Sequence, residues 1–538
     1  MDRDGDNEYE DRDGDAEYAD RSGIAEYVDE EDQEEALIAL IPTKDHGKRE
    51  CIMAKMKELE AFKNFQVYEE VEDQDQERLS SRWILTDKST TEQRKVKARL
   101  VCRGFEEVVK VQADSPTGSR ETLHMLLAIA ASKEWKVKSG DVKNAFLQGE
   151  LLDRDVYMEP PLEERKPGII WKLRKAVYGM NDAGRKWYFK LEETLTKLNC
   201  QKSKLDHCLF VSRSDQSLQG IILIWVDDIF YAGTQLFEEN VMKEVSKQFM
   251  IGRTEEETFV YIGLNITTTD HGITLDQINY VKDRLEPVVL KGGDVKRTLD
   301  KEETKLLRRL TGKINWAATQ TRPDLSYSVV ELSTRFKQPQ LEDLKKANKA
   351  ITKLVANPVK LLFPKITGSL KIVVYCDAAF RNLPDQISSG RGHVVFLTGA
   401  GGRAAPLGWT SNKVKRVVGS TVAAEALSLK MGLDHATYLR AILAEILGVD
   451  QLKIPIIGIT DSNNLYEAIY STKFVEDKKL RLDIAQIQED VEREKVEIKW
   501  VRARDMLADC LTKAGVKADP LMTAIVTGSF EKIEEKVE

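Results

Sequence analysis

Residues 221–233 read IILIWVDDIFYAG, an apolar run rich in β-branched and aromatic residues that carries two adjacent carboxylates, Asp227 and Asp228. Such a run is typical of two buried strands joined by a tight bend, and the bend falls at the acids. Neighbouring carboxylates in apolar surroundings repel each other and lose hydration, so either they project from the turn or a bound cation compensates them. The run alone leaves both possibilities open, because Asp is also a common turn residue.

A third carboxylate falls at the end of another predicted strand. Residues 135–151, WKVKSGDVKNAFLQGEL, predict a strand that ends near Asp141 and turns into a short helical segment. Residues 171–198 predict a helical layer between this strand and the hairpin. Three carboxylates at adjacent strand ends would form a divalent-metal site suited to phosphoryl transfer.

Upstream, residues 82–88 and 95–105 alternate apolar and basic residues as two strands would. One face would pack while the other presents Lys97 and Arg99, either as an ordinary solvated face or as a surface that meets phosphates. Helices are predicted at residues 48–70 and 120–133. The apolar face of the first is expected to consist of Met53, Met56, Leu59 and Phe62.

The composition bounds the class of protein. With 538 residues, of which 42% are hydrophobic and 32% charged, the chain predicts a globular protein of three or four domains. It holds no apolar run of the ~18 residues that a membrane helix needs, and Met1 opens an acidic stretch unlike a signal peptide. The six cysteines and six histidines are dispersed, which argues against a disulfide framework or a zinc module. We therefore expect no membrane partner and a cytosolic protein.

Charge is distributed unevenly along the chain. Residues 1–35 repeat a ten-residue acidic unit and carry a net charge of −14, which leaves +6 on residues 36–538 from a total of −8. With almost no aliphatic residues, the repeat cannot bury enough surface to offset its ordering entropy, and we predict a disordered tail. The mildly basic remainder is compatible with a nucleic-acid partner.

Several motifs together resemble a known family. DVKNAFLQGEL (141–151), AVYGMNDAGRKWY (176–188) and the VDD hairpin, preceded by RWI and KARLVCRGF, are similar to the reverse transcriptase of copia-type LTR retrotransposons. The resemblance continues through FVYIGLNI (259–266), GITLDQINYV (272–281) and TRPDLSYSVVELS (321–333), and so covers about residues 50–335. It implies an α/β (α+β) right-hand polymerase, with fingers and palm at residues 36–240 and a mostly helical thumb and connection at residues 241–365.

The resemblance also implies roles for individual residues. Asp141, Asp227 and Asp228 match the palm carboxylates that bind two Mg²⁺ ions, for which Mn²⁺ can substitute. Phe146 falls where the family places an aromatic steric gate against a ribose 2′-OH. Lys97 and Arg99 fall among the finger residues that reach the triphosphate. The family pattern is broken at Asn181, Asp182, Gly184 and Trp225, which puts contacts to template and primer at those positions in doubt.

A second catalytic unit is predicted at residues 366–515, followed by a C-terminal tail at residues 516–538. Three strands, a long helix, and further strands and helices indicate an αβ domain. Four acids stand out in this region, and each has a simple alternative explanation as a helix cap or an exposed residue. That explanation is weakest for Asp377, because a carboxylate inside the apolar strand LKIVVYCDAAF needs a partner or a metal. In their order they resemble the two-Mg²⁺ site of ribonuclease H, which copia-type elements place after the polymerase. The four acids are Asp377, Glu425, Asp461 and Asp509.

The predicted function is therefore an RNA-directed DNA polymerase with ribonuclease H activity. Its partners would be RNA template, DNA primer, RNA:DNA hybrid, dNTPs and the element's gag, protease and integrase, in a cytoplasmic virus-like particle and later in the nucleus. No His lies between Trp500 and Asp509, where many ribonucleases H have one, so slower cleavage is expected. Two alternatives stay open: an inactive or co-opted remnant that only binds nucleic acid, and a polymerase inactive because it was cut from a longer polyprotein.

Overall fold

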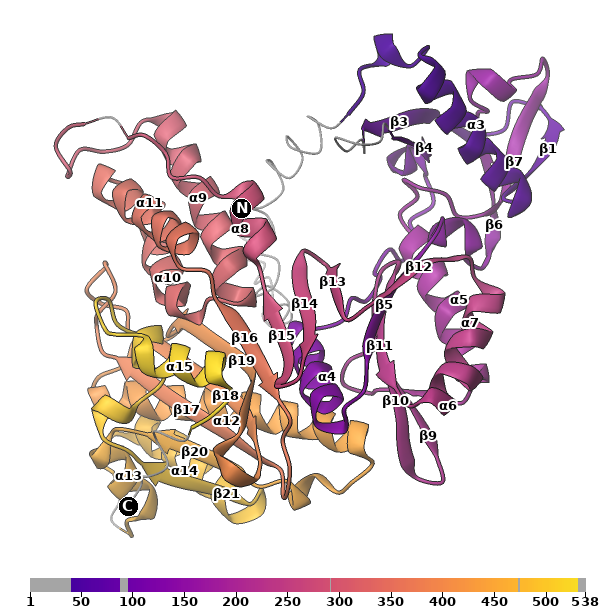
Figure 1. The fold of residues 1–538 in the computed structure, drawn as a ribbon. Helices are drawn as coiled ribbons and strands as arrows, with labels where there is room; N and C mark the ends of the chain where they lie inside the picture. The colour runs from indigo at the N-terminus through magenta and orange to yellow at the C-terminus, as the bar shows by residue number, and fades with distance from the viewer. Residues whose placement is uncertain (1–39, 88–94, 291, 473–474, 531–538) are drawn as a thin grey trace, which may run out of the picture.

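The computed structural model describes residues 40–87, 95–290, 292–472 and 475–530. The predicted acidic tail at residues 1–35 lies outside these described residues. Figure 1 shows four parts: strands and a helix at the upper right, a sheet with helices below them, a helical group at the upper left, and a second mixed sheet at the lower left. The predicted mixed α/β class is confirmed.

The upper right part, which we call the fingers, contains a four-stranded sheet in the order β1-β7-β6-β2 and a separate antiparallel pair of β3 and β4. The alternation that predicted the pair arises because one face packs against helix α3. The elements are α3 (Arg49–Asn64), β1 (Tyr68–Glu72), β2 (Arg78–Leu79), β3 (Ser81–Asp87), β4 (Val96–Cys102), β6 (Leu151–Met158) and β7 (Ile169–Lys175).

The predicted face of α3 was partly wrong. Met53 and Met56 are 61% and 64% exposed, whereas Lys55 and Glu58 are buried beside Leu59 and Phe62. The two charged residues can be buried because each meets a partner from a distant segment: the Lys55 ammonium pairs with Glu163 at 2.8 Å, and Glu58 accepts a hydrogen bond from Asn144 at 3.2 Å.

The part below the fingers, which we call the palm, contains a six-stranded antiparallel sheet in the order β12-β5-β11-β10-β9-β8. The helical layer predicted at residues 171–198 begins as strand β7 and becomes helical only at Ala183. The elements are α4 (Arg120–Lys133), β5 (Val137–Val142), α5 (Ala183–Lys197), β8 (Cys200–Lys202), β9 (Leu209–Ser214), β10 (Ser217–Trp225), β11 (Asp228–Gly233), α6 (Gln235–Phe237), α7 (Lys243–Gln248) and β12 (Ile251–Glu256).

The next segment is less helical than predicted. Four of its strands form an antiparallel sheet in the order β13-β14-β15-β16. The helices α8 to α11, which we call the thumb, gather beside this sheet (Figure 1). The apolar residues of FVYIGLNI alternate along these strands, so half of each strand faces the core. The elements are β13 (Thr258–Tyr261), β14 (Leu264–Thr269), β15 (Gly272–Asp276), α8 (Ile278–Arg284), α9 (Lys301–Gln320), α10 (Ser326–Thr334), α11 (Leu341–Ala356) and β16 (Lys360–Pro364).

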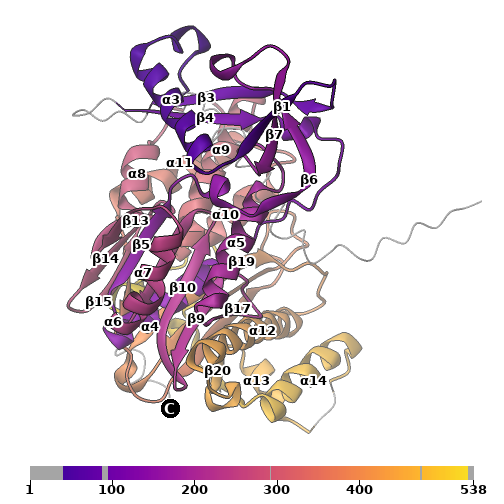
Figure 2. The same ribbon diagram turned by 90° about the vertical axis from the view of Figure 1, so that its right-hand side faces the viewer.

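The last part is a five-stranded mixed sheet in the order β19-β18-β17-β20-β21, in which β17, β20 and β21 run parallel. Helix α12 packs across β17, β18 and β20, and α13 and α14 lie at the outer side (Figure 2). The elements are β17 (Lys371–Ala379), β18 (Gly390–Thr398), β19 (Ala404–Lys413), α12 (Thr421–Leu447), β20 (Ile456–Thr460), α13 (Asn463–Tyr470), α14 (Lys478–Arg493), β21 (Val496–Trp500) and α15 (Asp519–Thr527).

The predicted C-terminal tail was wrong for the described residues 516–530. Helix α15 packs against β16 and β19, and Leu521, Ile525 and Phe530 are almost fully buried. Apolar residues four positions apart lie on one face of a helix, which gives this short segment a surface to bury. These residues therefore belong to the folded body.

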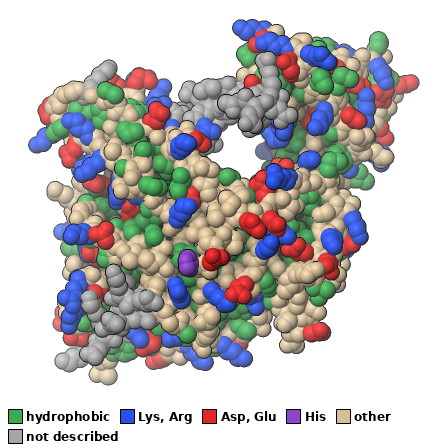
Figure 3. Space-filling model, in the orientation of Figure 1, with side chains coloured by type: hydrophobic (Ala, Val, Ile, Leu, Met, Phe, Trp, Pro, Cys, Tyr) green, Lys and Arg blue, Asp and Glu red, His purple; other side chains and the backbone are tan. Residues whose placement is uncertain are grey.

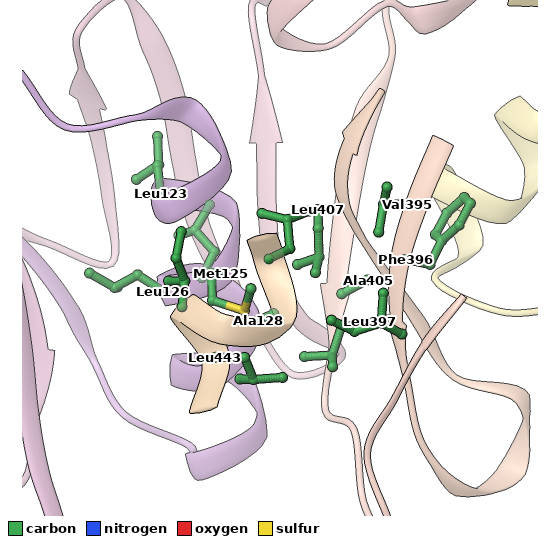
Figure 4. Packing of buried hydrophobic residues seen from close by; sticks show 14 of the residues in the cluster. Leu123, Met125, Leu126, Ala128, Val395, Phe396, Leu397, Ala405, Leu407 and Leu443 are labelled. Atoms are coloured by element: carbon green, nitrogen blue, oxygen red, sulfur yellow. The ribbon is translucent and has the colours of Figure 1, made fainter. Parts of the chain in front are cut away.

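Helix α4 joins the palm to the last sheet. Ten consecutive residues of this helix, 122–131, are buried, because the palm sheet covers one side and β16 and β19 cover the other. Figure 4 shows Leu123, Met125 and Leu126 of α4 and Leu407 of β19 in this packed region. The His124 Nδ1–H donates to the carbonyl of Leu407 at 3.1 Å. One continuous hydrophobic core thus runs through both parts.

The space-filling view in Figure 3 shows an opening above the palm, between the fingers and the thumb. All six cysteines are buried free thiols. Among the described residues, no helix combines the length and apolar character that a membrane crossing requires.

Candidate active sites

The first candidate site lies where β10 turns into β11. Trp225 pairs with Asp228, so the turn consists of Val226 and Asp227. Val226 has a φ of 55°, a left-handed conformation that is strained for a β-branched residue. Two contacts from other segments hold the turn in place. The Trp187 indole N–H donates to the Val226 carbonyl at 2.7 Å, and the Val142 N–H donates to the Asp227 carbonyl at 2.9 Å.

The register of the palm sheet brings the third acid to this turn. Strand β5 pairs antiparallel with β11, and Asp141 lies directly opposite Asp228. Residues opposite each other on antiparallel strands have Cβ atoms about 4.5–5.5 Å apart. Three carboxylates therefore meet at one end of the sheet, as the sequence predicted.

Burial and mutual repulsion disfavour the ionised acids. Burial, followed by the charges of Asp227 and Asp141, raises the pKa of Asp228 to about 6. Burial is also the main cause that raises the pKa of Asp227. A hard divalent cation with oxygen ligands would compensate this charge, so the donor set fits Mg²⁺ or Mn²⁺.

A pocket of about 220 Å³ opens beside these acids. It is lined by Arg99, Ala145, Phe146, Tyr178, Val226 and Asp227. The Phe146 and Tyr178 ring centroids lie 5.2 Å apart, and the Arg99 guanidinium lies 5.3 Å from the Tyr178 ring. Arg99 Nε is buried and has no hydrogen-bond partner among the described residues, which leaves one of its donors unsatisfied.

Lys97 also lies towards the acids. Burial, followed by the charge of Arg99, lowers the pKa of Lys97, while Asp141 and Asp227 act in the opposite direction. The three residues predicted to bind a nucleotide, Lys97, Arg99 and Phe146, are thus gathered at the palm acids. Tyr178 belongs to the motif AVYGMNDAGRKWY but was not predicted to line the site. The available indication was an aromatic residue directly before a glycine.

Gly179 explains how Tyr178 comes so close to β4. Its φ of 92° is unfavourable for other residues, and a Cβ there would collide with the Cys102 carbonyl oxygen. The Cys102 N–H also donates to the Tyr178 carbonyl at 2.9 Å. The Tyr-Gly pair therefore places the ring against the strand that carries Arg99.

The second candidate site lies at the C-terminal edge of β17 and β20. Tyr375 is paired with Ile459 on the parallel strands, which puts Asp377 and Asp461 at the same level. Glu425, in the second turn of α12, completes a group whose ligand atoms all lie within 4.8 Å of one another. Among the described residues it is the one such group of three acids; the palm acids are not gathered as closely.

The surroundings of these three acids disfavour their ionised forms, most strongly that of Glu425. Burial, followed by the charge of Asp377, raises the pKa of Glu425 to about 9. Burial likewise raises the pKa of Asp377 to about 6 and raises that of Asp461. Glu425 Oε2 is buried and accepts no hydrogen bond from the described residues. An unsatisfied carboxylate among carboxylates fits a site that holds a divalent cation.

Asp509 differs from its predicted partners. It lies in the short 3₁₀ helix η10 (Asp509–Leu511) and forms an ion pair with Lys513, whose Nζ is also 3.3 Å from Asp377 Oδ1. Against the effect of burial, the charges of Asp377 and Asp509 raise the pKa of Lys513. The fourth acid is thus linked to the group through Lys513, a residue that was not predicted to belong to the site although it lies only four positions after Asp509.

An antiparallel palm sheet with three acids at one end is thus followed by a mixed sheet with a buried acid cluster. Residues 65–298 match the family described as reverse transcriptase (RNA-dependent DNA polymerase). Over this range the chain resembles reverse transcriptases, and its similarity to the pol region of copia-type retrotransposons is as the motifs predicted.

Curated relatives extend the resemblance beyond that domain. The chain is 29% identical over 454 residues to the retrovirus-related Pol polyprotein from transposon RE1 of Arabidopsis thaliana, which covers 80% of this chain and 30% of the relative. It is 25% identical over 507 residues to the corresponding polyprotein from transposon TNT 1-94 of Nicotiana tabacum, with coverages of 87% and 37%. The chain therefore spans about a third of the length of these relatives.

Among solved structures, the fold is similar to that of a foamy viral protease-reverse transcriptase in complex with double-stranded DNA. The sequence identity is 12%, the TM-score is 0.47, and the similarity covers 85% of this chain and 84% of the other.

Proposed function

We propose that the chain is an RNA-directed DNA polymerase that copies retrotransposon RNA into DNA and degrades the RNA strand of the resulting hybrid. The observation that carries the proposal is the register of β5 and β11, which sets Asp141 opposite Asp228 beside the Arg99 and Phe146 pocket. Acids and cations that face each other across a pocket suit a substrate made of a metal-bound triphosphate.

At the polymerase site, Asp141, Asp227 and Asp228 hold two Mg²⁺ ions, and Lys97 and Arg99 contact the triphosphate. Such ions supply activation of the primer 3′-hydroxyl and neutralisation of the phosphoryl charge. Arg99 is suited to its role because its guanidinium is held against Tyr178 while Nε has no partner among the described residues. Phe146 lies on the same pocket wall and excludes the 2′-OH of a ribonucleotide.

At the second site, Asp377, Glu425 and Asp461 hold the metal ions for hydrolysis of the RNA strand, with Asp509 completing the set. Lys513 links Asp377 to Asp509 and keeps the fourth acid near the other three. The absence of a His between Trp500 and Asp509 is expected to slow cleavage.

The proposed partners are an RNA template, a DNA primer, the RNA:DNA hybrid and dNTPs, together with the element's gag, protease and integrase. The proposed location is a cytoplasmic virus-like particle, and later the nucleus. Binding to the hybrid is expected to fall with salt and to show little sequence preference, because phosphate contacts dominate such affinity.

Primer extension tests the polymerase. A labelled DNA primer on an RNA template, with dNTPs and Mg²⁺, should be extended by the wild type and not by the Asp227→Asn, Asp228→Asn variant. Failure of the wild type despite salt-sensitive hybrid binding would favour the inactive remnant. Activity recovered on addition of upstream polyprotein sequence would favour the truncated polymerase.

Cleavage of labelled RNA in the same hybrid tests the second site. Asp228→Asn should abolish synthesis and leave cleavage, whereas Asp461→Asn should do the reverse. Loss of both activities in either single variant would contradict two independent sites.

A further inference from the structure

Glu58 is a buried carboxylate of the fingers helix α3 that has no role in the mechanism above. Its side chain is 7% exposed and faces β4, the strand that carries the proposed triphosphate ligands Lys97 and Arg99. Burial raises the pKa of Glu58, while the Leu100 backbone, the Asn144 amide and the charges of Arg99 and Lys97 oppose the effect. The carboxylate thus lies behind the cationic wall of the pocket.

Glu58 is also bonded to the loop that leads to Phe146. The Asn144 side-chain Nδ2 donates to Glu58 Oε2 at 3.2 Å. Asn144 has φ 52° and ψ 40°, and it directly precedes the 3₁₀ helix η3 (Ala145–Gln148), which carries Phe146. Asparagine tolerates this left-handed conformation better than most residues, so Asn144 supplies both the backbone turn and the donor.

This contact joins two parts of the molecule. Asn144 follows palm strand β5, whereas Glu58 belongs to the fingers, and the two residues are 86 positions apart. Glu58 Oε1 is buried without a hydrogen-bond partner among the described residues. A buried carboxylate oxygen without a hydrogen-bond partner destabilises the fold. A contribution to stability therefore does not explain why a carboxylate stands at this position.

We propose that Glu58 is a positioning residue that, through Asn144, fixes the Phe146 ring in the nucleotide pocket and thereby sets the discrimination between dNTPs and rNTPs. The inference rests on the proposed polymerase function. A ring held by a short loop can exclude one hydroxyl group only if the loop itself is fixed.

Steady-state incorporation of one dNTP and the matching rNTP tests this role. Glu58→Leu removes the acceptor, and Asn144→Gly removes the donor while it still permits the left-handed backbone. Each should lower the dNTP-to-rNTP ratio of kcat/KM by about tenfold, which corresponds to about 1.4 kcal/mol, the order of one hydrogen bond to a charged group. The double variant should lower the ratio no further, because both changes break the same contact.

Two further variants separate positioning from a general loss of structure. Glu58→Gln keeps an oxygen that can accept from Asn144, and it should restore the ratio to within about twofold of the wild type. Glu163→Gln weakens the ion pair between Lys55 of the same helix and Glu163 without touching the gate loop, and it should leave the ratio unchanged.

The outcomes are distinct from those that test the polymerase itself. An equal fall in kcat for both sugars, or an unchanged ratio in Asn144→Gly, would overturn the positioning role while primer extension by the wild type stands. No extension by the wild type would overturn the proposed function and this inference with it.

Discussion

Glu425 should couple metal binding at the second site to the release of a proton. Burial and the charge of Asp377 raise its pKa to about 9, so Glu425 is protonated at pH 7 in the metal-free protein. A metal ligand must be ionised, and removing the proton two pH units below the pKa costs about 3 kcal/mol at 1.36 kcal/mol per unit. Between pH 7 and pH 9 the affinity for Mg²⁺ should therefore rise about tenfold per pH unit.

Without metal, a rise in pH lowers the stability of the folded protein, whereas it strengthens Mg²⁺ binding. The pKa of Glu425 is higher in the folded protein than the ordinary value of 4.5. The unfolded chain therefore gives up its proton first, and the metal-free protein loses stability as pH rises from about 4.5 to 9. Glu425→Gln removes this loss. In EDTA the variant should gain on the wild type as the pH is raised from 5 to 8.

Titration calorimetry with Mg²⁺ measures the proton directly. Both proteins would carry the Asp227→Asn and Asp228→Asn changes, so that the heat reports the second site. Runs at pH 7 in buffers of different ionisation enthalpy should give about one proton released per site, and almost none for Glu425→Gln. Asp377, with its pKa near 6, is mostly ionised at pH 7 and adds little. Equal proton release from both proteins would refute the argument.

Three further predictions concern the pocket and the core. Phe146→Val should lower the dNTP-to-rNTP ratio of kcat/KM by at least about tenfold, since it removes the ring that excludes the hydroxyl, and an unchanged ratio would exclude Phe146 as the gate. Glu494→Ala should destabilise the protein by about 2–3 kcal/mol in urea unfolding, because Arg440, which is fully buried, loses its carboxylate partner. Leu407→Ala should cost about 2–5 kcal/mol, and limited proteolysis should then open the palm and the last sheet together, whereas separate opening would contradict a shared core.

Much of the polymerase site could be predicted from the sequence. The apolar runs around Asp141 and around Asp227 and Asp228 predict strands that end at the acids, and the strands meet because each has one face to bury. The order of three acids along a predicted strand, helix and strand likewise indicated the acid cluster of the second site. These acids are Asp377, Glu425 and Asp461. Whether these residues catalyse the proposed reactions remains a prediction.

Other features could not be predicted because they depend on which polar groups lose water. Glu58 and Met56 lie two residues apart on one helix, and the helical period alone favoured burial of the methionine. Asn144, 86 residues away from Glu58, supplies the hydrogen bond that allows the carboxylate to be buried instead. Lys513 likewise became part of the second site only because η10 brings it to Asp377.

The sequence by itself determined the mixed α/β class, the strands that end at the palm acids and the order of the seven acids, because the period of apolar residues and the resemblance to copia-type motifs are properties of short stretches. Only the tertiary structure decided the packing of α4 between two sheets, the burial of α15 and the link of Asp509 to Lys513. The physical reason is that desolvation and ion pairing depend on distances between segments far apart in the chain, and hydrophobic packing fixes those distances only when the whole core forms.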